Sequence, residues 1–193
     1  MQIFELPKDE TRVWDLAVPV LQDEGITHAY LTSAIEEPSL YNEICFILQE
    51  ATKGDIVNIH INTPGGIVDS AFMLANAISN SKAKVIAHLS GTVASAGTII
   101  TMACDKVVVS PHLSFMIHNY SGGMHGKGHE MKARQKFTDD HLNAAFKSFY
   151  SGFLTEDEME RVLEGTDLWM GTEEVADRWK NRVSYMKGIK NEK

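Results

Sequence analysis

The residue best suited to nucleophilic chemistry is Ser95, in the run Gly91-Thr92-Val93-Ala94-Ser95-Ala96-Gly97. Ser95 follows a predicted strand and a short loop, and it begins a predicted apolar helix over 95–104. A serine hydroxyl at a helix N-terminus lies beside unpaired N–H groups and the positive end of the helix dipole, which stabilise an oxyanion. Taken alone, the residue is more typical of a simple N-cap, so a second group is needed to support nucleophilic chemistry.

A nucleophilic serine needs a base, and His118 is the best placed of the eight histidines. It ends a strand predicted over 114–117 and precedes a glycine-rich bend, so its ring can face a cleft. His60 and His88 lie inside predicted strands and are interpreted as structural. A Ser-His pair would carry out acyl transfer, with the imidazole accepting the hydroxyl proton.

The third group expected is a carboxylate that fixes the tautomer of the imidazole. Asp167 lies in a predicted turn with apolar residues after it, where a carboxylate can be held in place. The sequence has 26 acidic residues, and Asp105 and Asp177 are the main rivals.

The segment Asn62-Thr63-Pro64-Gly65-Gly66 ends one predicted strand and leads into a helix. Glycines leave backbone N–H groups without side-chain cover, as oxyanion holes and anion sites require. A tight connection between strand and helix explains the same residues equally well.

Predicted strands and helices alternate along the chain, which indicates α/β architecture with stacked ββα units. After His118 a bend over 121–128 leads into an amphipathic helix over about 130–150. The remaining predicted elements are strands over 27–33, 55–61, 84–89 and 106–109, and helices over 38–51, 67–79 and 155–163.

Composition excludes several classes of protein. The 193 residues carry 18 basic and 26 acidic side chains, a net charge of −8, which disfavours nucleic-acid binding. The uncharged stretch 85–104 is rich in small residues and is interpreted as buried rather than membrane-spanning. Cys45 and Cys104 lie in apolar runs, which favours reduced thiols and a cytoplasmic location. His125 and His129 are flanked by glycines and have no evident third ligand, so no metal or other cofactor is expected.

Four blocks of the sequence resemble the Clp protease proteolytic subunit, the ClpP family of serine peptidases. They occur in the family's order within about residues 27–176. The blocks are Ile61-Asn62-Thr63-Pro64-Gly65-Gly66, the run from Gly91 to Gly97, Phe115-Met116-Ile117-His118, and 165–174.

The resemblance implies specific roles for these residues. Ser95 would be the nucleophile, His118 the general base and acid, and Asp167 the orienting carboxylate. The backbone N–H groups of Gly66 and Ala96 would form the oxyanion hole. The backbone at Gly65, Gly122 and Gly123 would line the substrate cleft.

The resemblance also implies a fold and an assembly. The fold is a ClpP/crotonase-like superhelix with a protruding handle of strand and long helix, the latter at 130–150. Family members form seven-membered rings, two of which pair to enclose the active sites. Unfolded polypeptide would be the substrate, and an ATP-driven AAA+ unfoldase the expected partner, because the sequence has no nucleotide-binding motif of its own.

The sequence departs from the family at three places. Residues 1–26 form a divergent N-terminal segment, before a peptidase domain over 27–186 and a basic tail over 187–193. Asn119-Tyr120 follows His118 where the family commonly has Gln-Pro, and the usual Tyr-Gly-Leu-Ile-Asp ending is missing after Glu174. These departures fit a divergent or phage-encoded relative, such as a head-maturation protease that trims capsid or scaffold proteins.

Two further functions stay open. A crotonase-like acyl-CoA hydratase or isomerase shares the superhelix and a backbone oxyanion hole, but needs no Ser-His pair. A catalytically silent ring subunit would keep the fold and lack turnover.

Overall fold

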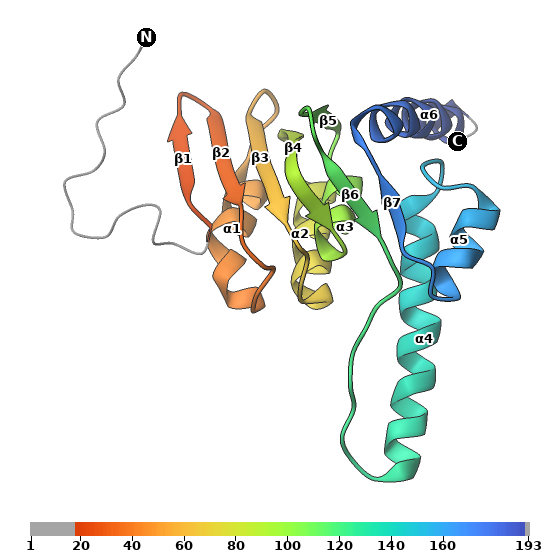
Figure 1. Cartoon of the computed structure of the whole chain (residues 1–193). Helices are drawn as coiled ribbons and strands as arrows, with labels where there is room; N and C mark the ends of the chain where they lie inside the picture. The colour runs from red at the N-terminus through yellow and green to blue at the C-terminus, as the bar shows by residue number, and fades with distance from the viewer. Residues whose placement is uncertain (1–17, 192–193) are drawn as a thin grey trace.

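The computed structural model describes residues 18–191, in which seven strands form one mixed sheet beside six α-helices (Figure 1). The order is β1-β2-β3-β4-β6-β7, and β5 pairs with β4 outside this path. The strands are β1 Val20–Asp23, β2 Ile26–Leu31, β3 Ile56–Thr63, β4 Lys84–Ala94, β5 Lys106–Val109, β6 Ser114–Ile117 and β7 Leu168–Met170. The helices are α1 Asn42–Glu50, which follows the short 3-10 helix η2 Pro38–Tyr41, α2 Val68–Asn80, α3 Ala96–Ala103, α4 Gly128–Tyr150, α5 Glu156–Leu163 and α6 Thr172–Asn191.

The central strands β2, β3, β4 and β6 run parallel, and β1 and β7 add antiparallel edges. The long strand β4 has two partners on one side. Its residues 86–89 pair with β5, and its residues 92–94 pair with β6. Predicted as a strand over 84–89 only, β4 continues to Ala94, because β6 supplies backbone partners that its small residues do not signal.

The core lies between the sheet and helices α1, α2 and α3. Val57, Ile59 and Ile61 of β3 are 0–1% exposed, as the alternation in a strand with one covered face requires. Gly97 brings α3 close to β3, since a Cβ there would lie 2.4 Å from Cγ2 of Thr63. The start of α3 is thereby fixed directly after β4.

The opposite face of the sheet carries a row of rings. His28 Nδ1 lies 3.0 Å from His60 Nε2, and His60 stacks between Tyr30 and His88. Nε2 of His88 lies 2.8 Å from Oδ1 of Asn58. The strand histidines therefore have structural partners, as the sequence indicated.

Helix α4 projects away from the sheet as a handle (Figure 1). Its 23 residues span about 35 Å at 1.5 Å per residue. The handle helix predicted at about 130–150 is present, and it begins two residues earlier. The handle strand that the resemblance implied is not formed over 118–127. A strand needs a hydrogen-bonding neighbour, and no described segment pairs with these residues.

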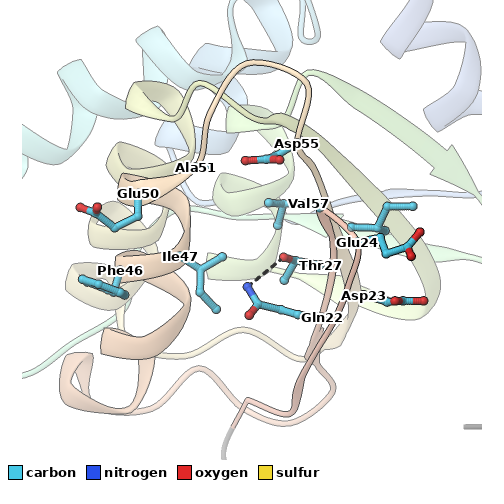
Figure 2. A pocket seen from close by; sticks show the side chains of 12 residues that line it. Gln22, Asp23, Glu24, Thr27, Phe46, Ile47, Glu50, Ala51, Asp55 and Val57 are labelled. Carbon is cyan, nitrogen blue, oxygen red and sulfur yellow. Dashed lines mark hydrogen bonds between the residues drawn. The ribbon is translucent and has the colours of Figure 1, made fainter.

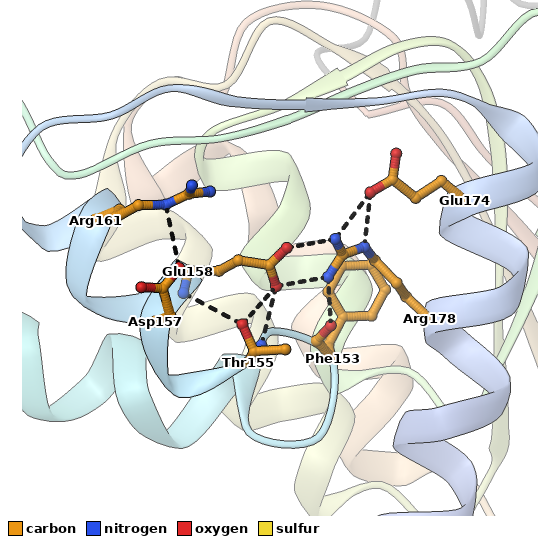
Figure 3. Close-up of polar contacts among 7 residues, drawn as sticks. All are labelled: Phe153, Thr155, Asp157, Glu158, Arg161, Glu174 and Arg178. Atoms are coloured by element: carbon orange, nitrogen blue, oxygen red, sulfur yellow. Dashed lines mark hydrogen bonds and ion pairs between the residues drawn. The ribbon is translucent and has the colours of Figure 1, made fainter.

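In the C-terminal part, one arginine joins α5 to α6. Arg178 of α6 donates to both carboxylate oxygens of Glu158 on α5, at 2.8 and 2.6 Å, and also to Glu174 (Figure 3). Thr155 and Glu158 form a capping box at the start of α5. β1, β7 and α6 were not predicted. No helix within residues 18–191 is long and apolar enough to cross a membrane.

Candidate active site

Ser95 lies at a sharp turn between β4 and α3. Its backbone has φ 54° and ψ −123°, and its side chain makes no capping hydrogen bond to α3. Instead, Oγ lies 2.7 Å from Nε2 of His118. The hydroxyl can donate to an unprotonated Nε2, so the geometry supports a nucleophile and its base rather than an N-cap.

A chain of hydrogen bonds holds the backbone of Ser95. Its N–H donates to the Met116 carbonyl at 2.9 Å, and its own carbonyl accepts from Oγ1 of Thr98 at 2.6 Å. Oγ1 of Thr98 also lies 2.5 Å from the hydroxyl of Tyr150 at the end of α4. Burial raises the pKa of Tyr150, so this hydroxyl stays neutral. The strained turn is therefore fixed by both β6 and α4.

Asp167 lies opposite His118 in the extension of the β6–β7 ladder. Ile117 pairs with Leu168 in antiparallel register, so the next positions along the two chains are His118 and Asp167. The side chain of Asp167 is exposed, and within residues 18–191 it has no hydrogen bond or ion pair. Likewise, Nδ1 of His118 has no hydrogen-bond partner among those residues. The structure brings Ser95 and His118 into contact. It places Asp167 opposite His118 in the strand register, without a hydrogen bond between their side chains.

The two alternative carboxylates, Asp105 and Asp177, interact with other groups. Asp105 accepts from the backbone N–H of Val85 at 2.8 Å. Asp177 pairs with Lys180 on the exposed face of α6 at 2.8 Å. Neither contacts His118, which leaves Asp167 as the nearest candidate by register.

The Pro-Gly-Gly turn lies against the start of α3. A Cβ on Gly65 would lie 3.1 Å from the backbone nitrogen of Ala96. Ala96 is the first residue of α3, so its N–H has no partner inside the helix. Gly66 bridges to Ile35 through the bonds of its two neighbours, Ile35 N–H to Gly65 O and Ile67 N–H to Ile35 O. Its own N–H is outside this bridge, as an oxyanion donor requires.

Gly122 and Gly123 lie exposed between β6 and α4. They are not among the residues that line the cavity beside Ser95, and a Cβ on either would meet no atom within 4 Å. The structure does not bring them to the Ser95–His118 pair.

A small cavity of about 40 Å³ opens beside Ser95 and His118. Its wall is mostly apolar and comes from α2, α3, α4 and the segment after His118. The lining residues besides Ser95 and His118 are Val68, Phe72, Ala96, Ile99, Asn119, Tyr120, Leu142, Phe146, Phe149 and Tyr150. The surface beside the Ser95 hydroxyl is therefore mainly apolar.

Apart from Ala96, none of these wall residues was assigned to the site from the sequence. Phe146, Phe149 and Tyr150 lie on one face of the predicted helix, but the sequence does not show what that face contacts. The signal available was their spacing of three and four residues, directly before the end of the helix. The spacing does not show that α4 runs back to the edge of the sheet. This path is what brings the face to Ser95.

A larger cavity of about 390 Å³ lies between the β1–β2 hairpin and α1 (Figure 2). Phe46, Ile47 and Val57 form apolar surface there, and several acidic side chains surround it. The described residues that line it include no serine, cysteine or histidine. Within the described residues, no group of three or more His, Cys, Asp or Glu could hold a metal ion.

A family model described as Clp protease matches residues 10–177. The chain is 30% identical over 145 residues to the "ATP-dependent Clp protease proteolytic subunit 3" of Rhizobium meliloti (strain 1021), over 70% of this chain and 72% of that protein. It is 42% identical over 74 residues to "ATP-dependent Clp protease proteolytic subunit 2" of Pseudomonas aeruginosa, over 37% of each chain. It is also 31% identical over 130 residues to the "ATP-dependent Clp protease proteolytic subunit" of Streptococcus suis, over 64% of each.

Proposed function

We propose that this chain, which belongs to the Clp protease family, is a serine endopeptidase that hydrolyses unfolded polypeptides through Ser95, His118 and Asp167. The observation that carries the proposal is the 2.7 Å contact between Oγ of Ser95 and Nε2 of His118. A serine that served only to cap α3 would direct its hydroxyl to the helix backbone. Here the hydroxyl faces a base instead.

In the acylation step, Oγ of Ser95 attacks the peptide carbonyl carbon, and its proton moves to Nε2 of His118. The carbonyl oxygen becomes an oxyanion, which the N–H groups of Gly66 and Ala96 stabilise. When the C–N bond breaks, His118 gives the proton to the leaving amine. The remaining acyl group is esterified to Ser95.

In the deacylation step, water attacks the ester carbonyl while His118 accepts a water proton. The C–O bond to Ser95 then breaks, and His118 returns the proton to Oγ. Asp167 orients the imidazole through Nδ1 once the site closes around the substrate. Catalytic hydrogen bonds often tighten only in the complex with substrate.

The family supports an assembly around this site. The relatives are named as subunits of an ATP-dependent protease, and we propose a ring of seven chains, or two such rings, served by an ATP-driven unfoldase. Helix α4 and the unpaired segment 118–127 are the elements that project far enough to join two rings. Native mass measurement checks the ring, since the expected species weigh seven or fourteen times the 21.5 kDa subunit. The free thiols of Cys45 and Cys104 suit a reducing cytoplasm.

Active-site labelling tests the proposed chemistry. A fluorophosphonate probe is expected to label the full-length protein at Ser95 and to block cleavage of an unstructured peptide. Ser95→Ala should abolish both labelling and peptide cleavage, and His118→Ala should greatly reduce both. Ser79→Ala is the matched control, because Ser79 is exposed at the far end of α2. Equal labelling of wild type and Ser95→Ala would contradict the proposal.

A catalytically silent ring subunit is the second candidate function. The observation that favours it is the exposed carboxylate of Asp167, which has no partner among the residues that the structure describes. Assembled rings that show neither labelling nor peptide cleavage would support this alternative. Thioester turnover that persists in Ser95→Ala would point instead to acyl-CoA chemistry.

A further inference from the structure

We propose that Asn119 is a positioning residue, whose side-chain amide holds the loop carrying Asp167 against the end of β6 that carries His118. This inference rests on the proposed function, because it concerns the same Ser95–His118–Asp167 site.

Both the nitrogen and the oxygen of the Asn119 side-chain amide form hydrogen bonds. Nδ2 donates to the carbonyl of Leu163 at 2.8 Å, and Oδ1 accepts from the backbone N–H of Tyr120 at 2.8 Å. The second bond fixes the side chain so that its donor end faces α5. A carboxylate of the same shape cannot replace it, because an ionised aspartate accepts hydrogen bonds and donates none.

The accepting carbonyl of Leu163 is well placed to restrain the loop that carries Asp167. Leu163 is the last residue of α5, where carbonyl groups have no partner within the helix. The turn that follows is closed by two backbone bonds, Gly165 N–H to Val162 O at 3.0 Å and Thr166 N–H to Arg161 O at 2.9 Å. Asp167 comes directly after this closed turn, so anchoring Leu163 limits where its carboxylate can be.

Two contacts therefore bracket the His118–Asp167 pair. On one side, Ile117 pairs with Leu168 in the last step of a ladder of only three residue pairs. On the other side, Asn119 bonds to Leu163. Among residues 18–191 the carboxylate of Asp167 makes no bond of its own, so these flanking contacts set its distance from Nδ1 of His118.

The next residue, Tyr120, is anchored to a different element. Its hydroxyl donates to Oδ1 of Asp139 on α4, and Nε2 of Gln135 donates to the same hydroxyl at 2.6 Å. The segment after His118 is thus tied to α5 by one residue and to α4 by the next. This separation allows the Asn119 contact to be removed without releasing the handle.

A double-mutant cycle tests the inference in the full-length protein, with peptide cleavage and fluorophosphonate labelling as readouts. Asn119→Ala should lower kcat by about 10²-fold, the effect of a misplacement near 1 Å, and leave KM within about twofold. In an Asp167→Ala background, adding Asn119→Ala should change kcat by less than about twofold, because both act through one carboxylate. Asn119→Gln keeps the donor and should recover part of the activity, whereas Asn119→Asp should not.

Asn80→Ala provides the matched control. Nδ2 of Asn80 donates to the Asn76 carbonyl at 2.8 Å, which is the same type of bond at the far end of α2. It should leave kcat unchanged. Thermal unfolding of each variant separates lost folding from lost positioning.

The outcomes distinguish this inference from the function on which it rests. A wild-type protein without labelling overturns both. A labelled wild type, with effects of Asn119→Ala and Asp167→Ala that multiply, overturns the role of Asn119 alone. Activity in Asn119→Asp equal to that in Asn119→Gln would also overturn it, because the donor would then be irrelevant.

Discussion

Gly65 and Ser95 lie so close that no side chain fits between them. A Cβ on Gly65 would lie 2.5 Å from Cβ of Ser95 and 2.8 Å from the carbonyl oxygen of Ala94. Gly65 also has φ 97°, a backbone conformation that favours glycine. The absence of a side chain at Gly65 is therefore a condition for the position of Ser95.

Gly65→Ala is expected to displace Ser95 from His118. Labelling by a fluorophosphonate should fall by about 10²-fold, and the free energy of unfolding by about 2 kcal/mol from backbone strain. Gly188→Ala in α6 is the control, since its new methyl group meets no atom within 4 Å. Labelling of Gly65→Ala at the wild-type rate would show that Ser95 does not depend on this contact.

The pair Thr98 and Tyr150 gives a test of the support behind Ser95. Thr98→Val removes the bond to the Ser95 carbonyl and leaves the buried Tyr150 hydroxyl unpaired, which should cost about 2 kcal/mol of stability. Adding Tyr150→Phe removes the unpaired hydroxyl, so the double variant should regain stability relative to Thr98→Val. Chemical denaturation measures both. A double variant less stable than Thr98→Val would contradict the hydrogen-bond account.

The ion pair of Arg178 and Glu158 predicts how stability depends on acid. Hydrogen bonding to Arg178 lowers the pKa of Glu158 to about 2, from an ordinary value of 4.5. The unfolded chain then binds a proton at higher pH than the folded chain does. The stabilisation is therefore complete above about pH 4.5 and is lost as pH falls toward 2.

Glu158→Gln should flatten this dependence and destabilise the protein at pH 7 by about 2 kcal/mol, the value of a hydrogen-bonded charge that is mostly shielded from water. Lys180→Met breaks the exposed pair with Asp177 and should change stability by less than about 0.5 kcal/mol. Unfolding curves from pH 2 to 7 measure both. A steep acid dependence that survives in Glu158→Gln would assign it to other groups.

The histidine row on the open sheet face predicts a second, milder pH dependence. Burial, and then the neighbouring histidines, lower the pKa of His60 below 6.5; burial and His28 do the same for His88. Because the folded pKa values are depressed, stability is at its full value above about pH 6.5 and falls as the pH drops through them.

His60→Gln should reduce the loss of stability between pH 7 and 5, because glutamine keeps the polar contact and takes up no proton. His125→Gln, at an exposed position before α4, should leave the loss unchanged. Thermal unfolding midpoints across this range give the comparison. Identical pH slopes in His60→Gln and wild type would remove the row as the cause.

The order of strands and helices from β2 to α5 could be predicted because periodicity and turn residues are local signals, whereas β1 was missed in the segment before residue 27. Ser95, His118 and Asp167 were recognised together because their motifs occur in the family's order. β7 was missed because three residues give no periodic signal, and α6 because its apolar positions are sparse among charges. The contact of Asn119 with Leu163 could not be predicted, because it joins residues 44 positions apart in the sequence.

The backbone conformation of Ser95 lowers the stability of the fold at the residue that the proposed activity requires. A non-glycine residue with φ 54° and ψ −123° costs on the order of 1–3 kcal/mol, whereas glycine adopts it freely. Even after the extra entropy that glycine loses on folding, roughly 0.5–1 kcal/mol, Ser95→Gly is expected to give a more stable but inactive protein. A chain that only built a ring would gain by this exchange. The serine at this turn is thus an energetic argument that its hydroxyl is used.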